Sequence, residues 1–389
     1  FIQYFLSISL NIVNYGIFSS VIALVFIFLP FINYGVSTHI VKDNIIKDVS
    51  NLQNILNLFL ILLTLNIIIF FIVLYFLFDL KNYVILVAFS FHLLSLSLFE
   101  VVYSIYQLKF QYLRILYLIV FFNFLKMICF SVIYLFFKQI SLDFVALIFF
   151  IFSLPIIVLF IYEFNLEIYN LIKNKVYLKI YTLYNEFKRL SVFGISGILF
   201  YFYYYSDVIM INLILGYEMS GYFALALSFI FLIYLFPTIT VDKLLQNYFY
   251  YYYQNKEYNK LNRIYNYTMI FFFIVSLILT YLTYKFSSNI FNIIYEDKFL
   301  ITSNLITIMA FAIVFRFLSI ANNGFVRAIS DMKGFTYILI FLTFFKFLLN
   351  IIIISNFNYE LIAYSFVFFE IVYLLLLFIY KRKLELNVY

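Results

Sequence analysis

Residues 55–78 read ILNLFLILLTLNIIIFFIVLYFLF, an apolar run that contains no charged side chain. A helix rises about 1.5 Å per residue, so a run of this length crosses a hydrocarbon core of about 30 Å. Because the backbone must satisfy its own hydrogen bonds inside a bilayer, the run is predicted to be a transmembrane helix. Similar runs lie near residues 17–36, 83–106, 113–137, 143–162, 192–214, 219–240, 266–285, 299–321, 335–354 and 360–380, with a stub at 1–10.

The composition agrees with a chain whose solvent is lipid. Hydrophobic residues make up 67% of the 389 residues, charged residues make up 11%, and the mean hydropathy is +1.07. This leaves too little polar surface for a water-soluble globule. The expected fold class is therefore an all-α membrane protein with about 12 transmembrane helices, the first of them truncated, since the chain starts at Phe1 inside an apolar run.

The positive charge predicts the orientation of the helices. If the carboxyl-terminal tail is placed in the cytoplasm, 18 of the 25 lysines and arginines fall in inside loops. Four fall outside, namely Lys81, Lys138, Lys285 and Lys298. This bias follows the positive-inside rule and predicts that both termini are cytoplasmic. The cations lie in short loops, which favours membrane lipids over nucleic acid as partners.

An internal repeat predicts two lobes. The segment 14–18 (NYGIF) opens one run and 219–223 (MSGYF) opens another, 205 residues later. Six helices per repeat give two lobes in the same orientation around a central cavity. We expect an N-terminal lobe at 1–164, an amphipathic cytoplasmic linker at 165–190 and a C-terminal lobe at 191–389. The alternative is that two glycine-aromatic helix starts coincide by chance.

The sequence contains no recognisable catalytic chemistry. The one cysteine, Cys129, lies in an apolar run, and the two histidines, His39 and His92, are far from any triad or metal-ligand spacing. No phosphate-binding glycine loop accompanies the helices. We therefore expect neither an enzyme nor a cofactor nor a metal site, and a carrier rather than an ATP-driven pump.

One stretch resembles a known family. The segment 206–233, SDVIMINLILGYEMSGYFALALSFIFLI, has an Asp, a leucine-glycine turn and a glycine-aromatic pair at Asp207, Leu215, Gly216, Gly221 and Tyr222. It is similar to the seventh and eighth helices of O-antigen and polysaccharide flippases of the Wzx type, in the multidrug/oligosaccharidyl-lipid/polysaccharide exporter superfamily. The segment 14–43 resembles the second helix of that family with its small-residue exit, and the segment 328–334 resembles the loop after its tenth helix. The small number of glycines, 8, is a departure from the family pattern.

This resemblance implies a two-lobed carrier with alternating access. Its cargo would be an undecaprenyl-diphosphate-linked oligosaccharide, such as an O-antigen or capsule repeat unit, crossing a bacterial inner membrane. A polysaccharide polymerase and a chain-length regulator would be its further partners. The sugar composition, coupling ion and oligomeric state do not follow from the sequence.

Six charged residues within the predicted helices are candidates for function, because a charge inside a bilayer needs a partner or water. The cations Arg316, Lys126 and Lys346 are predicted to bind the diphosphate of the cargo. The acids Asp207, Glu100 and Glu370 are predicted gating or ion-coupling groups. These roles compete with structural ones: Lys346 with Glu370, and Lys126 with Glu100 or His92, would form pairs between neighbouring helices.

Arg316 is the strongest candidate in the sequence. It has no acid at the same depth on the adjacent predicted helices, and Ser319, Asn323 and Arg327 follow it at helical spacing. We expect this stripe to line the cavity. Two rival functions remain: a multidrug or cation antiporter of the same superfamily, which would need acidic cavity residues, and a membrane polysaccharide polymerase, which would need a long outside loop.

Overall fold

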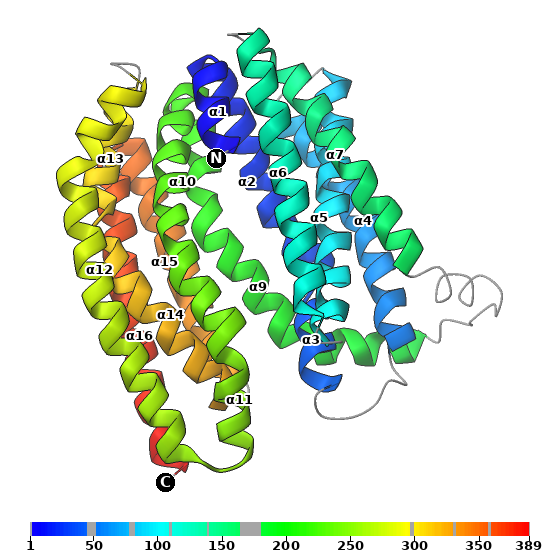
Figure 1. Cartoon of the computed structure of the whole chain (residues 1–389), viewed down its shortest axis with the longest axis vertical. Helices are drawn as coiled ribbons and strands as arrows, with labels where there is room; N and C mark the ends of the chain where they lie inside the picture. Colours follow the sequence, from blue (N-terminus) through cyan, green and yellow to red (C-terminus); the bar gives the residue numbers. More distant parts are fainter. Residues whose placement is uncertain are drawn as a thin grey trace. The chain divides into compact units, whose positions relative to one another are not determined.

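The computed structural model describes residues 2–44, 52–77, 82–108, 111–137, 140–163, 180–295, 299–329, 332–356 and 359–388. Every regular element that these residues form is a helix (Figure 1). Eleven of the described helices are long and apolar enough to cross a membrane. Each of them overlaps one of the eleven long apolar runs, so the prediction of an all-helical membrane protein is confirmed. The stub at 1–10 is the short helix α1 (Ile2–Ser9).

The contacts divide the chain into two compact units, residues Phe1–Ile209 and Met210–Tyr389. The boundary falls within the long helix α9 (Ile180–Leu215). Residues 180–190, expected in the linker, are the first turns of α9, because their apolar positions continue directly into the next apolar run. The rest of the expected linker, 165–179, lies outside the described residues. The lobe limits drawn from the sequence stay predictions.

The first unit is built around α5. It comprises α1, α2 (Ile12–Asn33), α3 (Val36–Asn44), α4 (Leu52–Leu77), α5 (Tyr83–Leu108), α6 (Tyr112–Phe136), α7 (Leu142–Glu163) and most of α9. Helix α5 packs against α2, α3, α4, α6 and α7. The rings of Phe18, Phe89 and Phe149 meet at its centre, with centroids 5.6 to 6.0 Å apart.

A tight approach joins α2 to α9 within this unit. Gly35, which follows the end of α2, has a φ of +78° and lies against α9 so closely that an added Cβ would be 2.6 Å from the Cβ of Phe193. The ring of Tyr34 stacks on Phe187 at 4.4 Å, and it also covers Gly194. Further along, Pro30 of α2 lies beside Gly197 of α9. The two helices are therefore held in one register by small residues.

The second unit is built around α14 (Ala312–Ile329). Its other helices are α10 (Tyr217–Ile239), the π-helix η2 (Thr240–Leu245), α11 (Gln246–Gln254), α12 (Tyr258–Tyr295), α13 (Leu300–Met309), α15 (Lys333–Asn356) and α16 (Leu361–Val388). Helix α14 packs against α10, η2, α11, α12 and α16. Its Phe317 is fully buried against Phe272 of α12. A helix with several buried polar residues is thus central to this unit.

One predicted span has different limits in the structure. The run 299–321 is divided into α13 and α14 by a turn at Ala310 and Phe311, and the second helix continues to Ile329. The sequence prediction ended the span too early, because polar residues after Ile320 looked like a loop. These residues are buried inside the unit instead, as Asn322 and Asn323 show with 0% and 3% exposure.

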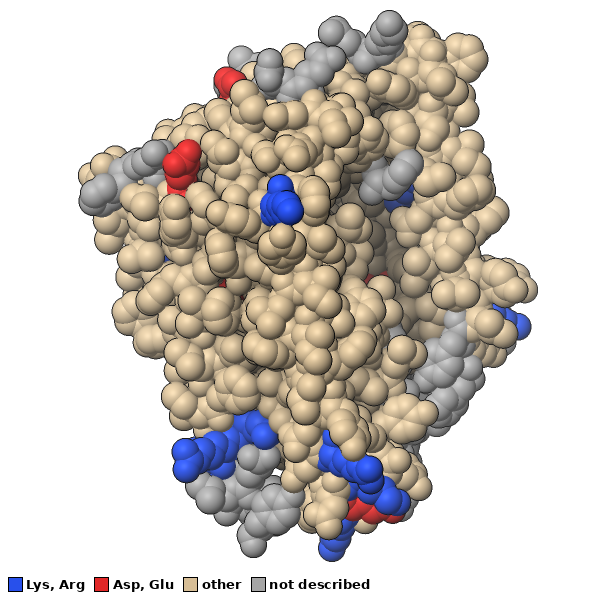
Figure 2. Space-filling model, turned by 60° about the vertical axis from the view of Figure 1, so that its left-hand side comes forward, with Lys and Arg blue, Asp and Glu red and all other residues tan. Residues whose placement is uncertain are grey.

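Charged side chains gather at one end of the face shown in Figure 2, the end where Figure 1 places the C-terminus and α11. Lys256 follows α11, Lys260 and Arg263 lie in the first turns of α12, and Lys381 and Arg382 lie near the end of α16. Most of the remaining face carries no charged side chain. A charged end next to an uncharged belt is the distribution expected of a helix bundle that crosses a bilayer.

Candidate functional site

The polar stripe predicted on α14 lies in the interior of the second unit. Arg316 is 5% exposed, Ser319 is fully buried and Asn323 is 3% exposed, while Arg327 lies in the last turn of the helix and is partly exposed. Burial of so many polar groups is stable only if they meet polar partners. The neighbouring helices α10, η2 and α16 supply those partners.

Arg316 meets an acid that the sequence analysis considered only as a partner of Lys346. Its Nη1 lies 3.9 Å from Oε2 of Glu370 on α16, and both side chains are buried. The rings of Tyr373 and Tyr234 lie 5.6 and 5.9 Å from the guanidinium carbon. The sequence analysis compared Arg316 only with the helices adjacent in sequence, whereas α14 packs on α16, which is not its neighbour in sequence.

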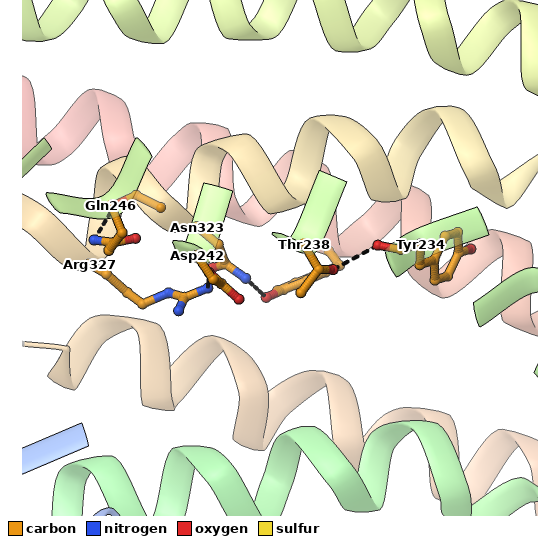
Figure 3. A network of polar contacts seen from close by, with 8 residues as sticks. Tyr234, Thr238, Asp242, Gln246, Asn323 and Arg327 are labelled. Atoms are coloured by element: carbon orange, nitrogen blue, oxygen red, sulfur yellow. Dashed lines mark hydrogen bonds and ion pairs between the residues drawn. The ribbon is translucent and has the colours of Figure 1, made fainter. Parts of the chain in front are cut away.

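The other end of the stripe is closed by a second ion pair. Nη2 of Arg327 lies 3.1 Å from Oδ1 of Asp242, which belongs to the π-helix η2. Between the two pairs, Nδ2 of Asn323 donates a hydrogen bond of 2.6 Å to the hydroxyl of Tyr373. Figure 3 shows Asn323 and Arg327 facing Asp242 and Gln246 across this network. The stripe is therefore a chain of polar contacts that links α14 to its neighbours.

The π-helix η2 lies unusually close to α14. An added Cβ at Gly324 would lie 2.4 Å from Cγ1 of Val241, and Nε2 of Gln246 donates a 3.2 Å hydrogen bond to the carbonyl oxygen of Gly324. The π-helix starts three residues after Pro237, which cannot donate a backbone hydrogen bond. Such single-turn π segments recur at functional sites.

Lys346 lies on α15, which packs against α16, the helix that carries Glu370. It is 1% exposed, and its Nζ lies 5.3 Å from the centroid of the Phe366 ring. One turn further along α15, Asn350 accepts a hydrogen bond of 2.5 Å from Ser365. The structure therefore brings Arg316 to Glu370 and places Lys346 on the neighbouring helix of the same unit.

In the first unit, Lys126 and His92 lie against the same aromatic ring. Nζ of Lys126 is 5.7 Å from the centroid of Phe149, and the ring of His92 meets Phe149 edge-on at 4.8 Å. His92, one of the two residues considered as partners of Lys126, therefore lies against the same ring as Lys126. Glu100, the other residue considered, contacts α2. Nδ2 of Asn33, at the end of α2, donates a hydrogen bond to Oε2 of Glu100.

Asp207, the sixth candidate, is fully buried in α9. It therefore lies within the helix, as the sequence analysis placed it. Full burial of a carboxylate inside a membrane helix is costly unless polar groups surround it. Its role stays a prediction.

Sequence reasoning missed several members of the network. Tyr234, Tyr373 and Asn322 are buried polar residues of the second unit, and Asn322 accepts a 2.8 Å hydrogen bond from the hydroxyl of Tyr265. In a chain with 39 tyrosines, single tyrosines carry no signal. Asp242 was assigned to a loop. The sequence signal that could have identified it is Pro237, five residues earlier, because a proline within a helix indicates an irregular turn after it.

The pair of Asp242 and Arg327 gives a prediction for stability. The side chains are 29% and 32% exposed, so their charges are partly shielded from water. Asp242→Asn and Arg327→Gln should each destabilise the protein, and a double-mutant cycle should give a coupling energy of about 1–2 kcal/mol. Unfolding in detergent micelles measures it.

The matched control is the pair of Glu257 and Lys260, 2.8 Å apart with side chains that are 36% and 64% exposed. Its coupling energy should be close to zero, because exposed pairs are screened by water. Equal coupling in the two pairs would contradict the structural role of the Asp242 contact.

Comparisons with known proteins agree with this architecture. Residues 193–352 match the family model described as MatE, a stretch that includes Asp207, Arg316 and Lys346. The structure is similar to a solved inward-facing conformation of a multidrug resistance MATE family transporter of the MOP superfamily, with a TM-score of 0.71 and 14% sequence identity. That match covers 97% of this chain and 90% of the other. No curated protein sequence matches the chain.

The fold is thus that of MATE transporters, and the sequence match extends over the part of the chain that holds the polar stripe. The solved structure is that of a membrane transporter, so this fold is one that a transporter uses. Which compound is transported is a separate question, which depends on the chemistry of the buried charges.

Proposed function

We propose that the protein moves an undecaprenyl-diphosphate-linked oligosaccharide across a bacterial inner membrane by alternating access. The observation that carries this proposal is Arg316, a guanidinium buried in a membrane-crossing helix with a stripe of polar side chains leading to Arg327. A guanidinium binds phosphate oxygens in pairs through its planar fork of donors. Lys346 in the same unit and Lys126 in the first unit add positive charge within the helices.

The long contact between Arg316 and Glu370 supports a mechanism in which the Glu370 carboxylate and the diphosphate of the cargo compete for the Arg316 guanidinium. At 3.9 Å it is longer than a charged hydrogen bond, which is about 2.7–2.9 Å. A diphosphate offers a guanidinium more negative charge and more acceptor oxygens than one carboxylate does. In this proposal Glu370 neutralises Arg316 when no cargo is bound, and it takes up a proton when the diphosphate replaces it. Glu370 is then the coupling group, and Asp207 is a second candidate.

A multidrug antiporter is the second candidate function. It is favoured by the buried acids Glu370 and Asp207, which suit a cationic drug, and by the name of the similar transporter. Against it stand the three cations within the helices, which would repel such a drug. The two functions therefore predict cargos of opposite charge.

The test compares the two cargos in one preparation. Purified protein is reconstituted into liposomes that contain either fluorescent undecaprenyl-diphosphate-linked tetrasaccharide or ethidium, with an imposed proton or sodium gradient. We expect the lipid to move between leaflets at least about tenfold faster than in protein-free liposomes, and ethidium to stay at the protein-free rate. Ethidium transport without lipid movement would refute the proposal and establish the antiporter.

The location and partners follow from this proposal. The charged end that contains the start of α12 and the end of α16 is assigned to the cytoplasm, where the lipid-linked unit is made. The delivered unit would then serve a polysaccharide polymerase and a chain-length regulator on the opposite side of the membrane.

A further inference from the structure

Three aromatic rings of the first unit form a near-parallel row. Phe26 of α2 stacks on Tyr205 of α9, with ring centroids 4.9 Å apart and planes 24° apart. Tyr201, one turn before Tyr205, is tilted only 13° from it at 6.2 Å and 19° from Phe26 at 6.4 Å. None of the three side chains is fully buried. They are not needed to fill the core of the unit, which lies around Phe89 and Phe149.

Polar groups lie beside this row. The carboxylate of Glu100 on α5 acts electrostatically on the phenol of Tyr201, and it accepts a hydrogen bond from the amide of Asn33 on α2. Glu100 is partly exposed in the last third of the membrane-crossing span Tyr83–Gln107. A partly exposed carboxylate at this depth would be costly against lipid tails, so the face that carries it borders water. The aromatic row next to it shares that face.

The row is held rigidly. After Phe26 in the sequence, Pro30 lies beside Gly197 and Gly35 lies beside Phe193, and these contacts hold α2 against α9. These contacts involve backbone or Cβ atoms, which have no rotamer freedom. A binding surface whose geometry is set in advance loses less entropy when a ligand binds.

We propose that Phe26, Tyr201 and Tyr205, together with Glu100 and Asn33, form a subsite for the sugars of the cargo. A pyranose has apolar C–H faces that pack on aromatic rings and hydroxyl groups around its edge that need hydrogen-bond partners. The row supplies the ring surface, and the phenols, the carboxylate and the amide supply the partners. This inference rests on the proposed function, since it assigns the carbohydrate part of the cargo, whereas Arg316 holds the diphosphate.

Aromatic rings and a carboxylate could also attract an organic cation. The polar groups around the row favour a sugar over such a cation. The side chain of Asn33 bonds to Glu100 and leaves less of its carboxylate for a cation. A neutral, hydroxyl-rich ligand fits this mixture of groups better than a cationic one.

The experiment separates sugar recognition from diphosphate recognition. Liposomes receive either fluorescent undecaprenyl diphosphate that carries a tetrasaccharide or the same lipid with a single sugar. Tyr201→Ala and Tyr205→Ala should slow the tetrasaccharide lipid about tenfold relative to the single-sugar lipid. Tyr201→Phe, which keeps the ring, should have a smaller effect. Tyr184→Ala changes an exposed tyrosine of the same helix and serves as the control, with both rates unchanged.

Each outcome has a distinct meaning. Equal slowing of both lipids, or slowing of neither, would overturn the sugar subsite while leaving the proposed function intact. A wild-type protein that moves neither lipid but transports ethidium, with ethidium transport lost in Tyr201→Ala, would overturn both and make the row a site for organic cations. If the alanine variants do not accumulate, Tyr201→Leu and Tyr205→Leu keep the apolar volume without the ring and give the same comparison.

Discussion

Arg316→Met should abolish transport of the lipid-linked oligosaccharide and should also lower the stability of the protein. The transport loss follows from removal of the proposed diphosphate ligand. The loss of stability follows from the contact with Glu370, whose carboxylate is fully buried and would be left without the opposite charge of Arg316. Removal of one partner of a buried pair destabilises a protein by about 3–5 kcal/mol. Protein abundance and detergent unfolding measure this effect.

The double variant Arg316→Met with Glu370→Gln separates the two effects. With both charges removed, no charge of this pair remains buried, so most of the lost stability should return. Transport should stay absent, because the anion-binding group is still missing. Arg316→Lys should retain part of the transport, since it keeps the charge but not the fork of donors. A double variant with wild-type transport at matched abundance would refute the role of Arg316, and Lys126 would become the leading candidate.

Gly35→Ala should be strongly destabilising. A φ of +78° is unfavourable for any residue with a Cβ, and the new Cβ would lie 2.6 Å from Cβ of Phe193 and 3.0 Å from the backbone nitrogen of Gly194. Neither atom can move away without movement of α9. Strain and overpacking together predict a loss of about 2–5 kcal/mol, measured by unfolding in detergent.

Gly197→Ala is the matched control on the same helix pair. Its Cβ would meet Pro30 at 3.5 Å, an ordinary van der Waals contact, in a helical backbone. Alanine also favours a helix over glycine by about 1 kcal/mol. This variant should therefore be neutral or slightly stabilising. Equal loss in both variants would show that the register of α2 and α9 does not depend on the close approach at Gly35.

The sequence by itself determined the class of the protein and the position of nearly every helix. Runs such as 55–78 specify a membrane helix without reference to the rest of the chain, because the thickness of a bilayer sets the length of the run. The polar stripe on α14 was also predictable, since Arg316, Ser319, Asn323 and Arg327 lie on one face of any helix.

Tertiary structure decided which residues meet that stripe. Glu370 is the partner of Arg316 because α14 packs on α16, and Asp242 is the partner of Arg327 because a π-helix after Pro237 turns it toward α14. Phe26 likewise meets Tyr201 and Tyr205 only because Gly35, Gly194 and Gly197 let α2 approach α9 closely. Hydrophobicity specifies that a helix is buried in the membrane, but it is nearly uniform around helices such as α2, α10 and α16. Which helices adjoin is therefore fixed by the shapes of small and aromatic side chains, and these become readable only in the packed structure.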